Sequence, residues 1–151
     1  MGLTPKRKVK AMTKVSMSTS IAVSAEKLWQ TIGGFHSISD WHPAIEKCVI
    51  EEQGGVTLRR LSLAGGGGEL VERLDKSDDD GRSYSYSIVS SPLPINNYTS
   101  TFRVIEGEDG KATVEWSSEF DSAGAPESDA MKIVEGIYSA GFDNLKKMFG
   151  G

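Results

Sequence analysis

Hydrophobic residues recur every three or four positions between Pro126 and Phe149, which is the pattern of a long amphipathic helix. The stripe consists of Ile133, Val134, Ile137, Tyr138, Gly141, Leu145, Met148 and Phe149. Pro126 suits the first helical position, and Gly150 stands where a helix can end. A helix of this length extends roughly 36 Å at about 1.5 Å per residue. We therefore expect a helix that crosses one whole face of a small domain.

Two glycines, Gly136 and Gly141, lie in the middle of this predicted helix. Each interior glycine costs about 1 kcal/mol of helix stability relative to alanine. One interpretation is close packing of the helix backbone against a sheet. The other is a hollow between helix and sheet in which a ligand sits. The helix pattern alone does not separate the two.

Alternating apolar and polar residues predict a first strand over Val15–Val23, followed by two short helices. Ser24 is placed to cap the first of these helices, and Gly33 to end it. The second is predicted over Phe35–Trp41. Glycine, proline and acidic turn signals then separate six more strands, which we predict at residues 45–52, 56–63, 69–75, 82–90, 95–106 and 111–121.

This order of elements predicts an α+β fold, in which a curved seven-stranded antiparallel sheet wraps round the long C-terminal helix. The short connections indicate hairpins between neighbouring strands. Strand parity predicts the inward faces, which carry Tyr84, Tyr86 and Ile88, then Tyr98, Ser100, Phe102 and Val104, then Val114, Trp116, Ser118 and Phe120. Such faces suit a small-molecule pocket, and they also suit an ordinary core.

Two charged residues fall on inward faces of the predicted strands. Arg59 shares its face with Leu61 and Leu63. Glu72 lies on the following strand, 69–75, and shares its face with the two leucines of that strand. An unpaired buried charge is very costly, so these two side chains should pair, meet water or meet a polar ligand. The alternative is that one strand has the opposite phase and leaves its charge on the surface.

The composition agrees with one domain over residues 12–151. The chain has 151 residues, of which 38% are hydrophobic, and a net charge of -4. Four basic residues lie within residues 1–11, which we interpret as a disordered arm: Lys6, Arg7, Lys8 and Lys10. The remaining chain is acidic, which argues against nucleic acid as a partner.

The sequence also bears on location. No apolar run approaches the roughly 20 residues of a membrane span, and no apolar segment follows the basic start. A lone Cys48 cannot form a disulfide within the chain. These features predict a cytoplasmic protein without a membrane span.

Several short runs resemble the SRPBCC superfamily, the helix-grip or START-like group that contains polyketide cyclases, lipid carriers and abscisic acid receptors. They are residues 39–43, Gly55 with Arg59, residues 72–74, residues 84–88, Pro94 with Asn97 and Tyr98, and Trp116 with Phe120. The resemblance covers residues 12–149 and implies a helix-grip fold. It does not select one function, because this scaffold serves carriers, receptors and enzymes.

The resemblance to abscisic acid receptors sharpens one position. Their ligand-gripping lysine lies six residues before a cysteine, and counting back from Cys48 puts His42 there. A histidine can donate a hydrogen bond or carry charge near neutral pH. Residues 64–68 and 91–94 match the two mouth loops of these receptors in place but not in sequence. Abscisic acid and phosphatase inhibition are therefore not expected.

A metal site is a weak hypothesis for this chain. His36, Asp40, His42 and Glu46 are close in sequence, but Pro43 interrupts the helix that would align them. Two histidines with uncertain carboxylates are thin support for a metal. We expect neither a metal nor another cofactor.

An acid–base pair is the better catalytic hypothesis. His42 or Glu72 would move a proton on a substrate carbonyl, while Tyr98 or Arg59 holds the oxyanion. That chemistry would suit a polyketide cyclase or dehydratase. It is the alternative to the function we favour.

We favour a binding protein, a carrier or sensor that encloses a small hydrophobic molecule such as a lipid, a polyketide or an isoprenoid-like compound. A partner-binding module without a natural ligand is a third hypothesis, and a homodimer is compatible with the sequence. The predicted ligand-binding residues are His42, Arg59, Leu61, Leu63, Glu72, Tyr86, Ile88, Tyr98, Ser100, Trp116, Ile137 and Gly141.

Overall fold

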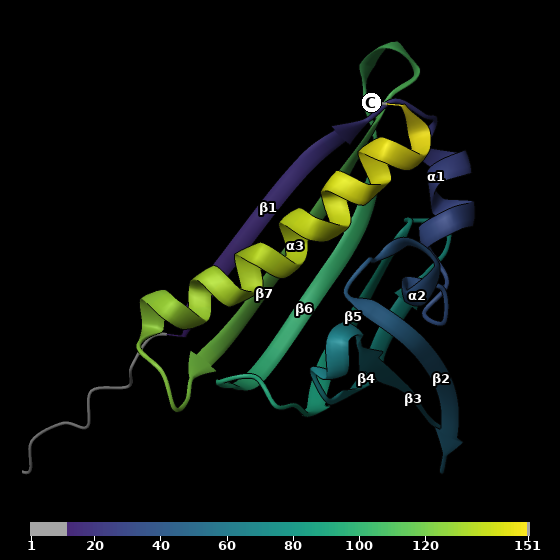
Figure 1. The fold of residues 1–151 in the computed structure, drawn as a ribbon. Helices are drawn as coiled ribbons and strands as arrows, with labels where there is room; N and C mark the ends of the chain where they lie inside the picture. The colour runs from purple at the N-terminus through teal and green to yellow at the C-terminus, as the bar shows by residue number, and fades with distance from the viewer. Residues whose placement is uncertain (1–11, 151) are drawn as a thin grey trace, which may run out of the picture.

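The computed structural model describes residues 12–150. The predicted basic arm over residues 1–11 lies outside the described residues, as does Gly151. The chain forms β1 (Thr13–Ile21), the short helices α1 (Ala25–Ile32) and α2 (Ile38–Trp41), six further strands and the long helix α3 (Glu127–Phe149) (Figure 1).

The six further strands follow one another along the chain. They are β2 (Ile45–Gln53), β3 (Val56–Leu63), β4 (Glu69–Asp78), β5 (Ser83–Ser90), β6 (Ile95–Glu106) and β7 (Ala112–Ser122). Two single-turn 3-10 helices lie in the connections, η1 (Ala64–Gly66) after β3 and η2 (Glu108–Gly110) after β6.

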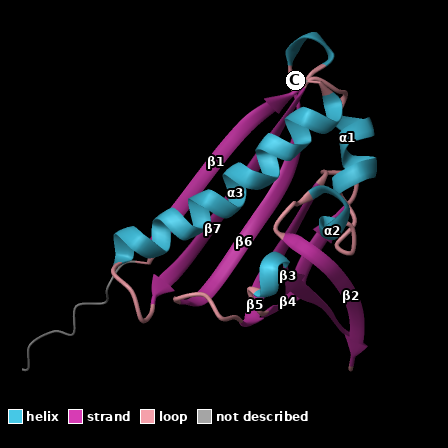
Figure 2. Ribbon diagram, in the orientation of Figure 1, coloured by secondary structure: helices cyan, strands magenta, loops and turns pink. Residues whose placement is uncertain are grey.

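All seven strands form one antiparallel sheet in the order β1-β7-β6-β5-β4-β3-β2. The chain therefore leaves β1 at one edge of the sheet and enters β2 at the other, and α1 and α2 make that crossing. Figure 2 shows α3 lying across the long strands β1, β7 and β6, while β2, β3 and β4 curve away from it. This is the helix-grip fold that the sequence predicted.

The strand faces follow the predicted parity. The inward residues of β5, β6 and β7 are buried, and Ile88 is partly buried. In β4 the pairing register shifts between Val71 and Glu72, and both residues are buried although they are adjacent. Such a bulge bends a strand and re-aims its side chains, which suits a sheet that curves round a helix.

Some elements differ from the predicted bounds: β1 lies two residues earlier, β4 runs on to Asp78, and two of the three helices begin later. Pro126 has an extended backbone with ψ 149°, so it caps α3 and the helix begins one residue later than predicted. Ser24 caps α1 as expected, its side chain accepting a hydrogen bond from the Lys27 amide at 3.2 Å. The second short helix is shorter than predicted, because residues 35–37 form turns instead.

The buried face of α3 also ends earlier than the predicted stripe. Leu145 is fully buried, whereas Met148 in the last turn is 44% exposed. The middle of the helix, around Val134 and Tyr138, is buried against the sheet. This middle part borders the candidate site.

Candidate functional site

A cavity of about 340 Å³ lies between the curved sheet and the middle of α3. This volume is at the lower end of the range for small-molecule sites. Most of its lining is aliphatic and comes from α2, the strands β2 to β6 and α3. The polar lining side chains are His42, Glu72, Tyr86, Tyr98 and Trp116.

Two connections, residues 64–68 and 91–94, meet beside this cavity. Ala64, Gly67 and Leu93 line it. A Cβ atom on Gly68 would lie 3.3 Å from Cγ of Pro92, so the two connections are in contact. These are the segments that the sequence comparison placed at the mouth.

Most of the predicted ligand-binding residues come together around the cavity. Those that line it are His42, Leu61, Leu63, Glu72, Tyr86, Ile88, Tyr98, Trp116 and Ile137. Arg59, Ser100 and Gly141 do not line it. Sequence reasoning missed Ile38 and Ile45, because the chain reaches them only after crossing from one sheet edge to the other.

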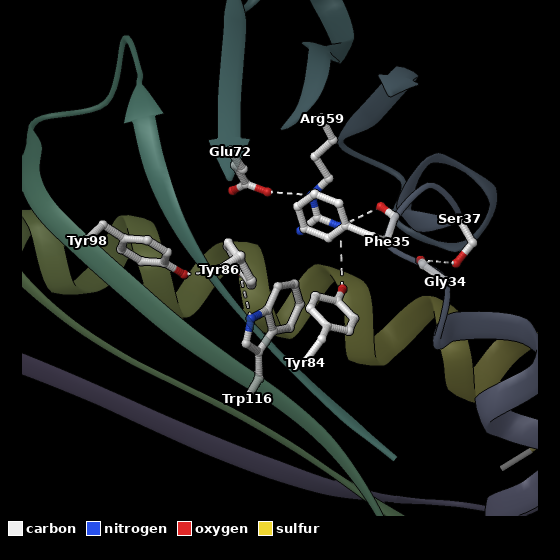
Figure 3. Close-up of polar contacts among 9 residues, drawn as sticks. All are labelled: Gly34, Phe35, Ser37, Arg59, Glu72, Tyr84, Tyr86, Tyr98 and Trp116. Atoms are coloured by element: carbon white, nitrogen blue, oxygen red, sulfur yellow. Dashed lines mark hydrogen bonds and ion pairs between the residues drawn. The ribbon is translucent and has the colours of Figure 1, made fainter. Parts of the chain in front are cut away.

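Arg59 and Glu72 form a buried ion pair. They face each other across β3 and β4, and Arg59 Nε donates to Glu72 Oε1 at 2.7 Å. Arg59 Nη1 also donates to the carbonyl of Phe35 at 2.9 Å, and the Phe35 ring lies 4.1 Å from the guanidinium carbon (Figure 3). The predicted inward phase of both strands is therefore confirmed. The alternative of a surface charge is wrong, since the two residues are 0% and 4% exposed.

Charge balance fixes the ionisation of this pair. Burial raises the pKa of Glu72, and the nearby Arg59 opposes that rise. Burial alone would lower the pKa of Arg59, but the Glu72 carboxylate raises it above its ordinary value. A buried guanidinium without a counter-charge costs several kcal/mol. The pair is therefore held as a guanidinium and a carboxylate, and the second Glu72 oxygen points away from Arg59 (Figure 3).

Both ring nitrogens of His42 are engaged by the backbone. Nε2 lies 2.7 Å from the carbonyl oxygen of Ile137, and Nδ1 accepts the Ala44 amide at 3.1 Å. A carbonyl only accepts, so the proton is on Nε2 and the ring is neutral. Burial is also the main reason that the pKa of His42 is lowered. His42 lines the cavity but has no free nitrogen for a ligand or a proton transfer.

The predicted hollow at Gly141 is not found. A Cβ atom there would lie 2.9 Å from the ring of Trp41 and 2.9 Å from the ring of His42. Real Cβ contacts are rarely that close, so the glycine is needed for tight packing of α3 on these rings. At Gly136 nothing lies within 4 Å of the same position. The close-packing interpretation therefore holds for Gly141, and the cavity lies nearer the N-terminal end of α3, at Ile133, Val134 and Ile137.

A chain of buried hydroxyl groups runs beneath the cavity. Trp116 Nε1 donates to the Tyr86 hydroxyl at 3.0 Å, which lies 3.3 Å from the Tyr98 hydroxyl (Figure 3). The Tyr98 hydroxyl lies 2.5 Å from that of Tyr138 on α3. Burial raises the pKa of Tyr86 and of Tyr98 well above 10. These tyrosines are therefore neutral hydrogen-bonding groups.

Sequence reasoning missed the part that Tyr138 plays in this chain. Its position in the apolar stripe predicted burial alone. The Tyr138 hydroxyl also lies 3.4 Å from Ser100 Oγ, and the ring stacks on Trp116 with centroids 4.2 Å apart. The signal that could have revealed this contact was Ser100, an inward-facing polar residue on a sheet that packs against the helix face carrying Tyr138.

Other kinds of site are not found in the described part of the chain. Within residues 12–150, no three His, Cys, Asp or Glu side chains lie close enough together to hold a metal ion. The same residues contain no helix that is long and apolar enough to cross a membrane.

The family model described as polyketide cyclase/dehydrase and lipid transport matches residues 12–150. The chain belongs to this family. The family is of the SRPBCC type that the short runs resembled. A search of curated proteins found no significant match.

Solved structures place this polyketide cyclase/dehydrase family member among bacterial relatives. An uncharacterized protein from Bacillus thuringiensis is 37% identical with a TM-score of 0.86, over 92% of this chain and 100% of its own. The protein XoxI from Bacillus cereus is 38% identical with a TM-score of 0.86, over 91% of this chain and 96% of its own. Zhui aromatase/cyclase from Streptomyces sp. R1128 is 18% identical with a TM-score of 0.70, over 92% of each chain, and shares the fold.

The chemistry available in this family member's cavity is narrow. His42 is neutral and engaged at both nitrogens, and the two tyrosines are neutral. Glu72 is paired with Arg59 through one oxygen. The arrangement can enclose and orient an apolar molecule, and Glu72 is the one ionised side chain among the described residues that line the cavity.

Proposed function

We propose that this protein binds a small hydrophobic molecule in the cavity under α3, as a carrier or sensor. The observation that carries the proposal is an apolar cavity whose polar side chains are already bonded to the protein. A binding protein needs a preformed apolar enclosure with a few fixed polar groups. An acid–base enzyme needs free groups that can take up and release protons near the substrate.

A cyclase or dehydratase is the second candidate. The family description supports it, and so does the second Glu72 oxygen, which is not used by Arg59. Against it stands His42, whose nitrogens both bond to backbone groups. Turnover of a polyketide-like substrate that is kept in Val89→Trp and lost in Glu72→Gln, while circular dichroism shows Glu72→Gln to be folded, would favour this candidate.

The binding proposal is tested with N-phenyl-1-naphthylamine, a neutral probe whose fluorescence rises in apolar surroundings. We expect saturable binding by the unmodified protein. Ile88→Trp places a large side chain on the cavity wall and should weaken binding by about tenfold or more. Val89→Trp is the matched control, because Val89 is the next residue of β5 and is 57% exposed.

The two variants separate filling of the cavity from a general effect of tryptophan on β5. Equal binding by Ile88→Trp and the unmodified protein would contradict the proposed site. Equal weakening by both variants would do the same. Circular dichroism of each variant checks that β5 still folds.

A further inference from the structure

We propose that the cavity selects uncharged molecules that carry a hydroxyl group, because its polar side chains offer hydrogen-bond acceptors and no free donor. The inference rests on the proposed function, that the cavity binds a small hydrophobic molecule. It adds the chemical class of that molecule. Every polar hydrogen on the side chains that line the cavity is already used in a hydrogen bond within the protein.

Two of the lining side chains use their N–H groups within the protein. The His42 ring proton is on Nε2 and bonds to the Ile137 carbonyl at 2.7 Å. The Trp116 indole N–H bonds to the Tyr86 hydroxyl at 3.0 Å. Neither group has a second hydrogen on nitrogen, so neither can donate to a ligand.

The donor in each hydroxyl–hydroxyl contact follows from the last contact in the series, the one between Ser100 and the Ser117 carbonyl. Ser100 Oγ donates to the Ser117 carbonyl at 2.8 Å, so its contact with Tyr138 requires Tyr138 to donate. Tyr98 must then donate to Tyr138, and Tyr86 to Tyr98. This is the one assignment that gives each contact a hydrogen. It leaves no tyrosine hydrogen directed into the cavity.

The backbone amides of four residues that line the cavity also have partners within the protein. The amides of Ala44, Ala64, Leu93 and Ile95 bond to His42 Nδ1, the Ala44 carbonyl, Ser91 Oγ and the Leu93 carbonyl respectively. Three buried donors lack a partner within the described residues: Arg59 Nη2, Trp41 Nε1 and the Ser118 hydroxyl. None of the three residues lines the cavity, and each is 6% exposed or less.

What remains for a ligand is a set of acceptors. The second carboxylate oxygen of Glu72 is not used by Arg59, and each cavity-lining tyrosine oxygen keeps lone-pair capacity. A ligand hydroxyl can donate to these atoms. A ligand carboxylate would bring a second negative charge beside Glu72, with no side-chain donor on the described cavity wall to satisfy it, in surroundings of low dielectric constant.

The test compares three probes of similar shape by isothermal titration calorimetry near neutral pH. They are 2-naphthol, which has a hydroxyl donor, 2-methoxynaphthalene, which has none, and the anion 2-naphthoate. We expect 2-naphthol to bind roughly fivefold more tightly than 2-methoxynaphthalene. We expect 2-naphthoate to bind about tenfold or more weakly than 2-naphthol.

A pair of matched variants assigns this selectivity to the hydroxyl chain. Tyr98→Phe removes the acceptor of the Tyr86 hydrogen and frees a donor beside the cavity, to which the 2-methoxynaphthalene oxygen can bond. The preference for 2-naphthol over 2-methoxynaphthalene should therefore narrow. Tyr84→Phe removes another buried hydroxyl, 3.4 Å from Arg59 Nη1, from a residue that does not line the cavity. It should keep the preference.

The outcomes distinguish this inference from the proposed function. If 2-methoxynaphthalene or 2-naphthoate binds as tightly as 2-naphthol, the cavity binds ligands and the acceptor inference is wrong. A preference that is unchanged in Tyr98→Phe also overturns it. If none of the three probes binds, the proposed function itself fails.

Discussion

Arg59 and Glu72 are the costliest residues of the cavity region to leave unpaired. Their 2.7 Å contact lies in the core, whereas Arg103 and Glu115 form a 2.9 Å pair with side chains 53% and 41% exposed. A buried charge that loses its partner keeps the desolvation cost and loses the attraction that offsets it. An exposed charge remains solvated by water.

We therefore predict that the same substitution, glutamate to glutamine, lowers the free energy of unfolding by different amounts at the two sites. Glu72→Gln should lower the free energy of unfolding by about 3–5 kcal/mol. Glu115→Gln should lower it by less than about 1 kcal/mol. Urea unfolding measures both, and the double variant Arg59→Met with Glu72→Leu should recover much of the loss. Similar losses at the two sites would show that breaking the buried Arg59–Glu72 pair costs no more stability than breaking the exposed Arg103–Glu115 pair.

His42 makes stability depend on pH. Its pKa is lower in the folded protein than the ordinary value of 6.5, chiefly through burial. The folded protein therefore resists protonation of His42. The stability that neutral His42 contributes is fully present above pH 6.5 and is lost as the pH falls below that value. Protonation would also remove the Nδ1 acceptor of the Ala44 amide.

Thermal unfolding between about pH 7.5 and 5.5 measures this effect. The midpoint should fall with pH in the unmodified protein and in His36→Gln, which replaces an exposed histidine. His42→Gln should have a lower midpoint and a flatter pH dependence. An unchanged pH dependence in His42→Gln would contradict the account of this residue.

At the scale of elements, α3 has two glycines in different surroundings. Gly136→Ala should stabilise the protein by up to about 1 kcal/mol, because alanine is the better helix former and nothing lies within 4 Å. Gly141→Ala should be less stable than Gly136→Ala by about 1–3 kcal/mol, because its Cβ would press on Trp41 and His42. Urea unfolding of both variants provides the comparison, and equal stabilisation would mean that there is space at Gly141.

The elements themselves were largely predictable from the sequence. Alternation identified the inward faces of β3 and β4, and with them the buried positions of Arg59 and Glu72. The contact between Tyr138 and Tyr98 was not predictable, because the periodicity of α3 does not say which strand each turn meets. The hollow predicted at Gly141 was wrong for a related reason. In the sequence, a glycine in a helix is equally consistent with a void beside the helix and with an aromatic ring packed on its backbone.

At the scale of the whole molecule, the sheet, α2 and α3 enclose a cavity of about 340 Å³. Every strand from β2 to β7 contributes to its lining, so a ligand would contact most of the sheet. The cytoplasmic location and the homodimer stay predictions. The central claim is that this cavity holds a small hydrophobic molecule.

Native mass spectrometry of gently purified protein, before and after organic extraction, tests that claim most directly. We predict a reproducible adduct that extraction removes, and whose mass identifies an uncharged, hydroxyl-bearing compound. Ile88→Trp purified in the same way should lack the adduct, and Val89→Trp should keep it. A bare protein mass for the unmodified chain that does not change when such compounds are added in excess would contradict the account.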